Sequence, residues 1–122
     1  MAPTMFERYG GFVIVRKIVS EFYDRVLVSD RLQRFFVDTD MRLLIDHQTK
    51  FIASLMGGPA AYTDDVLRRV HQGLGITPDD FAETAALLRE TLEDFDVAPH
   101  DVDQVCRAFE RRKSCIVTAA AA

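Results

Sequence analysis

The chain has 122 residues, of which 48% are hydrophobic and 28% are charged. This length and composition are typical of one folded domain with a single core and room for one sizeable ligand pocket. Nineteen Asp and Glu residues outnumber fifteen Lys and Arg residues, the formal net charge is -4, and the longest basic run is Arg111-Arg112-Lys113. An acidic chain without a basic patch does not favour nucleic acid as a partner.

Two features indicate a cytoplasmic protein. The apolar run Phe12-Val13-Ile14-Val15 ends at Arg16 and is too short for the core of a signal peptide or for a membrane span, so no membrane partner is expected. Cys106 and Cys115 lie nine residues apart, and on one helix they would face opposite sides, which excludes a disulfide within that helix. Reduced thiols are typical of the cytosol.

Apolar residues recur at steps of three and four along most of the chain, which predicts at least four amphipathic helices. The first follows Gly10-Gly11 and carries Phe12, Val15, Ile18, Val19, Phe22 and Val26. The second carries Met41, Leu44, Phe51, Ile52 and Leu55 and is closed by Gly57-Gly58-Pro59. A short helix is expected at about residues 64–72. The third long helix starts at the capping sequence Thr77-Pro78-Asp79-Asp80 and carries Phe81, Ala85, Leu88, Leu92 and Phe95. The fourth carries Val102, Val105, Cys106, Phe109 and Ile116.

The fold class predicted from this pattern is all-α, because no stretch shows sustained alternation of apolar and polar residues. Residues 1–118 are expected to form one domain. Residues 119–122, which are all alanine, are expected to form a disordered tail.

Three polar residues interrupt the apolar stripes. Tyr23 follows Val19 by four residues on the first long helix, and Gln48 precedes Phe51 by three on the second. Taken alone, they are better explained as a tyrosine with its hydroxyl in water and an amide at a helix edge. A histidine such as His71, at the end of a short apolar stripe, is more often a core residue than a metal ligand. One histidine cannot form a tetrahedral zinc site, but it suffices as an axial ligand of haem iron.

Five segments together resemble a known family. FERYGG, SEFYDRVL, RLQRFFVDTDM, HQTKFIASLMGGP and VHQGLGIT are similar, in order and spacing, to the truncated haemoglobins, most closely group I. The resemblance covers roughly residues 5–95. It implies a shortened globin fold, a two-over-two helical sandwich around a haem, with a nearly helix-free stretch before the short helix that carries the proximal ligand. It further implies haem b as the cofactor and a diatomic gas, such as oxygen, nitric oxide or carbon monoxide, as the ligand. Oxidation of nitric oxide to nitrate would need an external reductase.

The resemblance also implies roles for individual residues. His71 is the proximal iron ligand, with its other ring nitrogen donating to a carbonyl or to water. Tyr23 and Gln48 are the distal hydrogen-bond donors to the bound gas, beside the apolar distal residue Leu44. Phe36 packs against the porphyrin, with Phe35 as its core-facing neighbour. Further pocket walls are Met41, Phe51 and Ile52 on the distal side and Leu67, Ile76, Phe81 and Leu88 on the proximal side and back, all of which are core residues even without a cofactor.

His47 has three interpretations that the sequence leaves open: a sixth ligand of the iron, a contact to the edge of the haem, or a solvent-exposed side chain. The first would make the protein a six-coordinate electron-transfer or redox-sensing haem protein with His47 and His71 on iron. A third class, a helical interaction domain without a cofactor, does not fit the resemblance. The remaining polar candidates are His100, which we expect to be exposed, and Lys50, Arg68 and Arg69, which are either haem propionate partners or part of a solvated face.

Overall fold

The computed structural model describes residues 3–58 and 64–118. The elements in this part of the chain are α1 (Met5–Arg8), α2 (Gly11–Leu27), the 3-10 helix η1 (Gln33–Phe36), α3 (Met41–Leu55), α4 (Asp64–His71), α5 (Pro78–Asp94), α6 (Pro99–Glu110) and α7 (Lys113–Ile116). The described residues contain no strand, so the all-α prediction is confirmed. The expected tail at 119–122, and most of the stretch expected before α4, lie outside the described residues.

The starts of α2, α3 and α5 follow from residues that the sequence places there. Thr77 accepts a hydrogen bond from the backbone of Asp80 while the Asp80 side chain accepts one from the backbone of Thr77, and Pro78 occupies the first turn of α5. Asp40 caps α3 by accepting from the backbone N–H of Leu43. Gly10, before α2, has a φ of 102°, and a Cβ at this position would lie 2.5 Å from the Ile14 side chain. Each boundary therefore follows from local chemistry.

The fourth predicted helix is wrong in one respect: the chain does not form a continuous helix through Ile116. It turns at Arg111 and Arg112, which separate α6 from α7, so Cys106 and Cys115 lie on different helices. Both thiols are free and buried. A continuous helix would have placed Cys115 opposite Cys106, and the turn allows both to enter the core. No glycine or proline marks this turn in the sequence.

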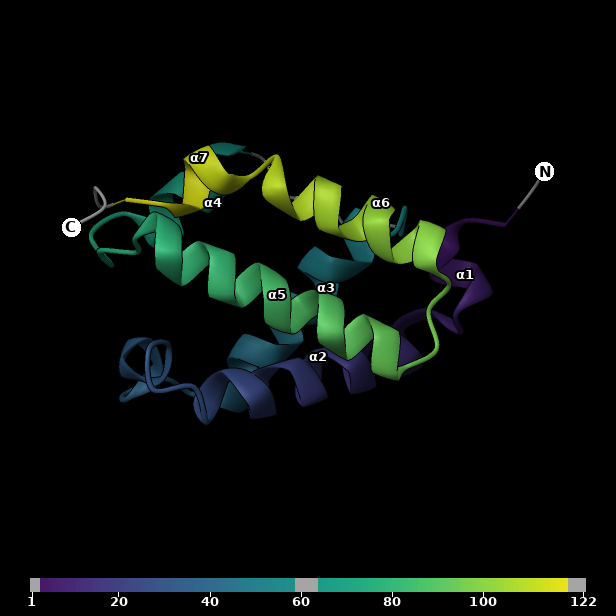
Figure 1. Ribbon diagram of the computed structural model, residues 1–122, viewed down its shortest axis with the longest axis horizontal. Coiled ribbons are helices and arrows are strands. Elements are labelled where there is room, and N and C mark those ends of the chain that lie inside the picture. The colour runs from purple at the N-terminus through teal and green to yellow at the C-terminus, as the bar shows by residue number, and fades with distance from the viewer. Residues whose placement is uncertain (1–2, 59–63, 119–122) are drawn as a thin grey trace.

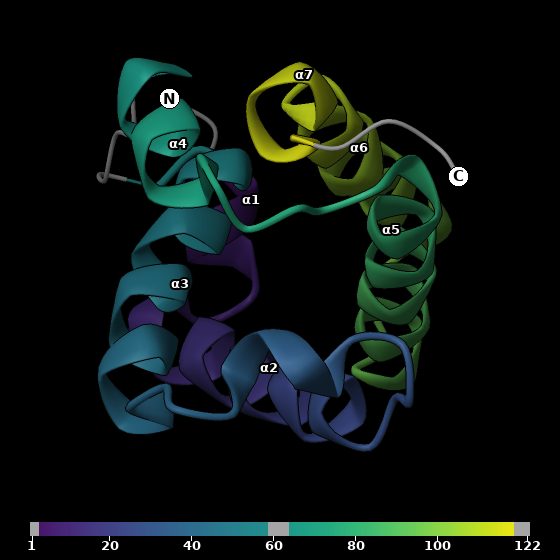
Figure 2. The same cartoon turned by 90° about the vertical axis from the view of Figure 1, so that its left-hand side faces the viewer.

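Four helices form two layers, as the two-over-two arrangement requires. α2 packs against both α3 and α5, and α6 packs against both α5 and α3. Figure 2 shows these helices around the centre of the molecule, with α3 and α5 on opposite sides. The short helices α4 and α7 pack together at one end of the molecule, and α1 lies at the other (Figure 1).

A cluster of polar groups joins α1 to the start of α6. The Asp101 carboxylate accepts hydrogen bonds from the Arg8 guanidinium at 3.0 and 3.1 Å and from the Tyr9 hydroxyl at 2.6 Å. The Tyr9 hydroxyl in turn accepts from the backbone N–H of Ala98 at 3.0 Å. These hydrogen bonds, led by those from Arg8 and Tyr9, outweigh the effect of burial and hold the pKa of Asp101 below its usual value.

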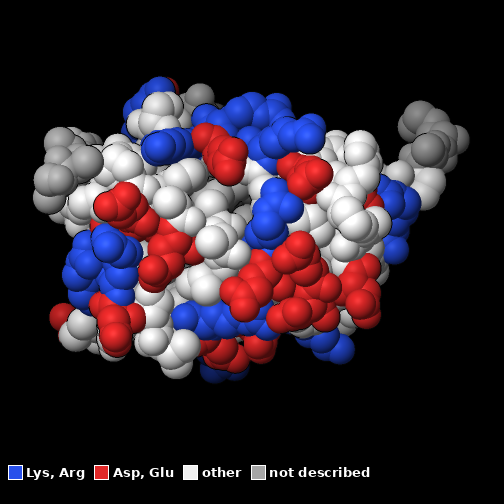
Figure 3. Space-filling model, in the orientation of Figure 1, with Lys and Arg blue, Asp and Glu red and all other residues white. Residues whose placement is uncertain are grey.

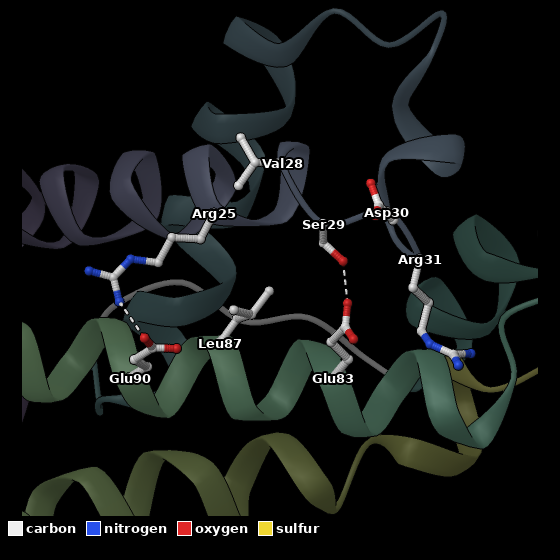
Figure 4. A pocket seen from close by; sticks show the side chains of 8 residues that line it. All are labelled: Arg25, Val28, Ser29, Asp30, Arg31, Glu83, Leu87 and Glu90. Carbon is white, nitrogen blue, oxygen red and sulfur yellow. Dashed lines mark hydrogen bonds and ion pairs between the residues drawn. The ribbon is translucent and has the colours of Figure 1, made fainter.

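A second set of polar contacts joins the end of α2 and the following turn to α5. Ser29 donates a hydrogen bond to Glu83, and Arg25 pairs with Glu90 at 4.0 Å across a shallow groove (Figure 4). The groove also exposes Val28, while Ser29 and Arg25 are directed at Glu83 and Glu90 across it. Acidic and basic side chains are likewise interspersed on the face of the molecule in Figure 3. The contact between Ser29 and Glu83 therefore holds the turn that leads into η1 against α5.

Candidate functional site

A largely apolar cavity of about 600 Å³ lies between the two helical layers. Its size falls in the range of cofactor and small-molecule sites, roughly 300–1,000 Å³. The helices α2, α3, α4 and α5 each supply several wall residues, and η1 supplies Phe35 and Phe36. The helices α6 and α7 supply one each, Phe109 and Ile116. Residues that are far apart in the sequence are thus brought to one site.

His71 is the last residue of α4 and lines this cavity. Its Nδ1 lies 2.7 Å from the backbone carbonyl oxygen of Leu67, one helical turn earlier. A carbonyl oxygen can only accept, so Nδ1 carries the proton and donates it, and in the neutral ring Nε2 keeps a lone pair. The ring is therefore oriented by its own helix, with its second nitrogen available as a metal ligand.

Tyr23, on α2, is a second polar residue that lines the cavity. Its side chain is 8% exposed, and its ring packs edge-on against Phe22 at 4.9 Å and Phe36 at 5.8 Å between ring centroids. Burial raises the pKa of Tyr23, so the hydroxyl stays protonated and can donate a hydrogen bond. Gln48, half-buried on α3, also lines the cavity.

Neither of these two polar side chains forms a hydrogen bond with another described residue. Their donors are therefore available to a ligand bound in the cavity. Tyr23, Gln48 and His71 line the same mainly apolar space, together with the polar side chains of Thr39, His47, Asp80 and Thr84.

A family model and a relative of known family identify the family of this chain. The model of the family described as Bacterial-like globin matches residues 4–118. A group 1 truncated hemoglobin of Mycolicibacterium paratuberculosis is 35% identical over 106 residues, covering 87% of this chain and 78% of that protein. The chain belongs to the bacterial-like globins.

Solved structures agree with this assignment. The truncated hemoglobin of Tetrahymena pyriformis in its Fe(III) form superposes with a TM-score of 0.86 at 27% identity, covering 95% of this chain and 99% of that one. The 2/2 hemoglobin of a Synechococcus species, with covalently attached heme, gives a TM-score of 0.86 at 29% identity, covering 94% and 98% of the two chains. Haem is accordingly the cofactor of this globin, and binding of a diatomic gas is its function.

Most of the expected wall residues of the globin pocket do line the cavity. Phe36, Leu44, Phe51 and Ile52 line it from η1 and α3, and Leu67, Ile76, Phe81 and Leu88 line it from α4, the following loop and α5. Met41 is half-buried against the core but is not a cavity-lining residue. Phe35, expected to face only the core, is half-buried, lines the cavity, and lies under the Arg34 guanidinium at 4.4 Å.

The sequence did not single out several residues that also line the cavity. They are Phe22, Val26, Leu32, Thr39, Val66, Val70, Leu74, Asp80, Thr84, Phe109 and Ile116. Periodicity had assigned four of them to the core: Phe22, Val26, Phe109 and Ile116. The sequence therefore predicted that these residues are buried, but not that they line a cavity. Leu74 stands between two glycines, and no periodic pattern covers it.

His47 lies on the cavity wall and is also exposed, so it is at the cavity mouth. His100 is exposed, as expected. Arg68 is exposed and pairs with Asp65 at 3.5 Å, and Lys50 and Arg69 are exposed as well. None of these three cations is among the residues that line the cavity.

Asp80 is the buried carboxylate of the globin pocket. It accepts from Arg34 at 2.8 Å, from Arg31 at 3.4 Å and from the backbone N–H of Thr77 at 3.0 Å. Burial alone would raise the pKa of Asp80, but the hydrogen bonds from Thr77 and the charge of Arg34 outweigh it and lower the pKa. Because Arg34 lies on η1, this carboxylate holds the segment that carries Phe36 against α5.

Proposed function

We propose that this globin binds one haem b non-covalently in the cavity, with His71 as the proximal ligand of the iron and with oxygen or another diatomic gas on the side of Tyr23 and Gln48. The observation that carries the proposal is the hydrogen bond from His71 Nδ1 to Leu67. Ligating histidines characteristically donate their other ring N–H to such a group, which fixes the tautomer and the orientation of the ring. The sequence contains no CxxCH motif, which favours non-covalent attachment.

The residues present fit a haem. The cavity walls are mainly aliphatic and aromatic, and His71 offers one neutral nitrogen, which is the ligand that a porphyrin-bound iron requires from a globin. The haem supplies the iron to which the gas binds. Phe36 is placed on the wall next to Tyr23, where an aromatic ring can pack against the porphyrin.

The distal role of Tyr23 and Gln48 follows from their hydrogen-bonding capacity. The Tyr23 hydroxyl is a donor held in an apolar setting by Phe22 and Phe36. The Gln48 amide has two N–H donors and comes from a different helix, so the two side chains can approach one ligand from two directions. Both donors favour a polar gas ligand such as oxygen over a less polar one such as carbon monoxide.

Absorption spectra of the purified protein, first oxidised and then reduced, test the proposal directly. His71→Gly should lose the five-coordinate ferrous spectrum, and added imidazole should restore it, because free imidazole replaces the missing side chain. His100→Gly is the matched control, since that histidine is exposed and does not line the cavity. A His71→Gly protein with an unchanged ferrous spectrum would show that His71 is not the ligand.

A second candidate function rests on His47, which lies at the mouth of the same cavity. With His47 and His71 both on iron, the protein would be a six-coordinate haem protein suited to electron transfer or redox sensing. A low-spin ferric spectrum that becomes high-spin in His47→Ala supports this function. A high-spin spectrum that is identical in wild type and His47→Ala excludes it.

The finer expectations for partners and location complete the proposal. Conversion of nitric oxide and oxygen to nitrate consumes one electron per turnover, so we assign an external reductase as the partner of any such activity. A cytoplasmic location is supported by the free cysteines Cys106 and Cys115. No helix in the described part of the chain is long and apolar enough to cross a membrane. We take residues 1–118 as one globin domain.

A further inference from the structure

Three hydrogen bonds connect the loop after α4 to Thr118, two residues beyond α7. The Thr118 hydroxyl oxygen accepts from the backbone N–H of Gly75 at 3.1 Å and from that of Ile76 at 3.3 Å. The backbone N–H of Thr118 donates to the carbonyl oxygen of Ile76 at 2.9 Å. We call this set of three bonds the Thr118 clasp. It joins segments more than 40 residues apart in the sequence.

The loop joined by the clasp has little else to hold it. Gly73 and Gly75 both have a positive φ, 83° and 73°, and a Cβ built at either position would have no neighbour within 4 Å. Leu74, between them, is 47% exposed. A loop with glycine freedom and few packing contacts relies on its hydrogen bonds for a defined position. Thr118 provides that position at Gly75 and Ile76.

The clasp lies next to the side of the cavity that contains His71. The backbone N–H of Leu74 donates to the carbonyl oxygen of His71 at 3.2 Å, so the loop begins at the histidine itself. Ile76, which belongs to the clasp, and Ile116, two residues before Thr118, both line the cavity. α4 also packs directly against α7. The clasp therefore joins the segment that carries His71 to the segment that forms the adjacent wall.

We propose that Thr118 is a positioning residue for the proximal side of the haem pocket: through the clasp it fixes the loop after α4 and thereby the position of His71. The inference rests on the proposed ligation by His71. Thr118 is not among the residues that line the cavity, and it acts through Ile76 and the end of α4. The hydroxyl is the decisive atom because it accepts from two N–H groups.

Three variants separate the hydroxyl from the shape of the side chain. Thr118→Val removes the acceptor and keeps the branched shape and the backbone N–H. Thr118→Ser keeps the acceptor, and Ser114→Ala, which removes an exposed hydroxyl from the neighbouring helix α7, is the control. Haem transfer from each holoprotein to an excess of a haem-accepting apoprotein gives the rate of haem loss. Resonance Raman spectra of the ferrous forms report the iron–histidine stretching band, which a merely structural change far from the histidine would leave in place.

We expect Thr118→Val to lose haem about three to ten times faster than wild type, the effect of one or two modest hydrogen bonds, and to shift the iron–histidine band. Amide exchange of Gly75 and Ile76 in the holoprotein should accelerate as well. Thr118→Ser and Ser114→Ala should match wild type in all three measurements. Equal haem loss and an unshifted band in Thr118→Val, with wild type binding haem normally, would overturn the inference. A wild-type protein that takes up no haem would instead overturn the proposed function.

Discussion

Replacement of Tyr23 by phenylalanine tests the distal site with the smallest change in structure. The substitution removes one oxygen atom and keeps the ring that packs edge-on against Phe22 and Phe36. The hydroxyl has no hydrogen-bond partner among the described residues, so its removal leaves no other protein group unpaired. The stability of the fold should therefore change little, and any effect on ligand binding should reflect a lost bond to the ligand itself.

The size of that effect follows from the character of the bond. Bound oxygen is a partly charged acceptor, and a buried phenol that donates to it forms a charge-assisted bond worth about 1.5–3 kcal/mol. Since about 1.4 kcal/mol corresponds to a tenfold change, Tyr23→Phe should release oxygen roughly ten to a hundred times faster than wild type.

Stopped-flow displacement of oxygen by carbon monoxide measures this rate. The dissociation of carbon monoxide serves as the control. Bound carbon monoxide accepts hydrogen bonds weakly, so its dissociation rate should change little in the same variant. Equal acceleration for both gases would indicate altered access to the cavity rather than a lost hydrogen bond. If oxygen release from Tyr23→Phe stays within about twofold of wild type, Tyr23 is a packed aromatic residue and the distal assignment is wrong.

Three further predictions concern residues of the same pocket and its supports. Gln48→Leu should accelerate oxygen release less than Tyr23→Phe. The effect of the double variant, expressed as a free energy, should be smaller than the sum of the two single effects because the two side chains share one ligand. Stopped-flow rates of oxygen release from all three variants check this. Asp80→Asn should destabilise the protein by about 1–3 kcal/mol in urea unfolding, because it weakens the hydrogen bonds that hold η1 to α5. The pKa of Asp101 is lowered in the folded protein, mainly by hydrogen bonds from Arg8 and Tyr9. The contribution of Asp101 to stability is therefore complete above its pKa in the unfolded chain, about 3.9, and is lost as the pH falls through its lower pKa in the folded protein. Unfolding free energies measured from pH 6 to about pH 2 should therefore fall less steeply for Asp101→Asn than for wild type, and parallel curves would contradict this.

The periodicity of apolar residues predicted the long helices because each of these helices buries only one of its faces. α2, α3 and α5 each bury one stripe against the core, and apolar residues at steps of three and four record that stripe directly. Tyr23, Gln48 and His71 were found because each interrupts or extends such a stripe. Their convergence on one cavity was beyond any local pattern, and only the resemblance to a family predicted it.

Contacts between distant segments left no signal in the sequence. The turn at Arg111 and Arg112 has no glycine or proline, and tertiary packing of Cys115 outweighs the helical propensity there. Asp80 had been assigned to the cap of α5, which it does form, but its two arginine partners lie more than 40 residues earlier. An exposed threonine near the end of a chain, such as Thr118, likewise resembles any surface residue until its partners are known.

The bond between Arg8 and Asp101 has a consequence for biosynthesis. Its two residues are separated by 93 positions, so the contact between α1 and α6 cannot form until Asp101 has left the ribosome. Ile116, which closes the cavity, emerges later still. Contacts of such long sequence separation form late because the intervening loop must first be ordered. A nascent chain thus exposes its apolar cavity walls until the segment around Ile116 has been synthesised, and we expect the complete haem pocket to form only after that point.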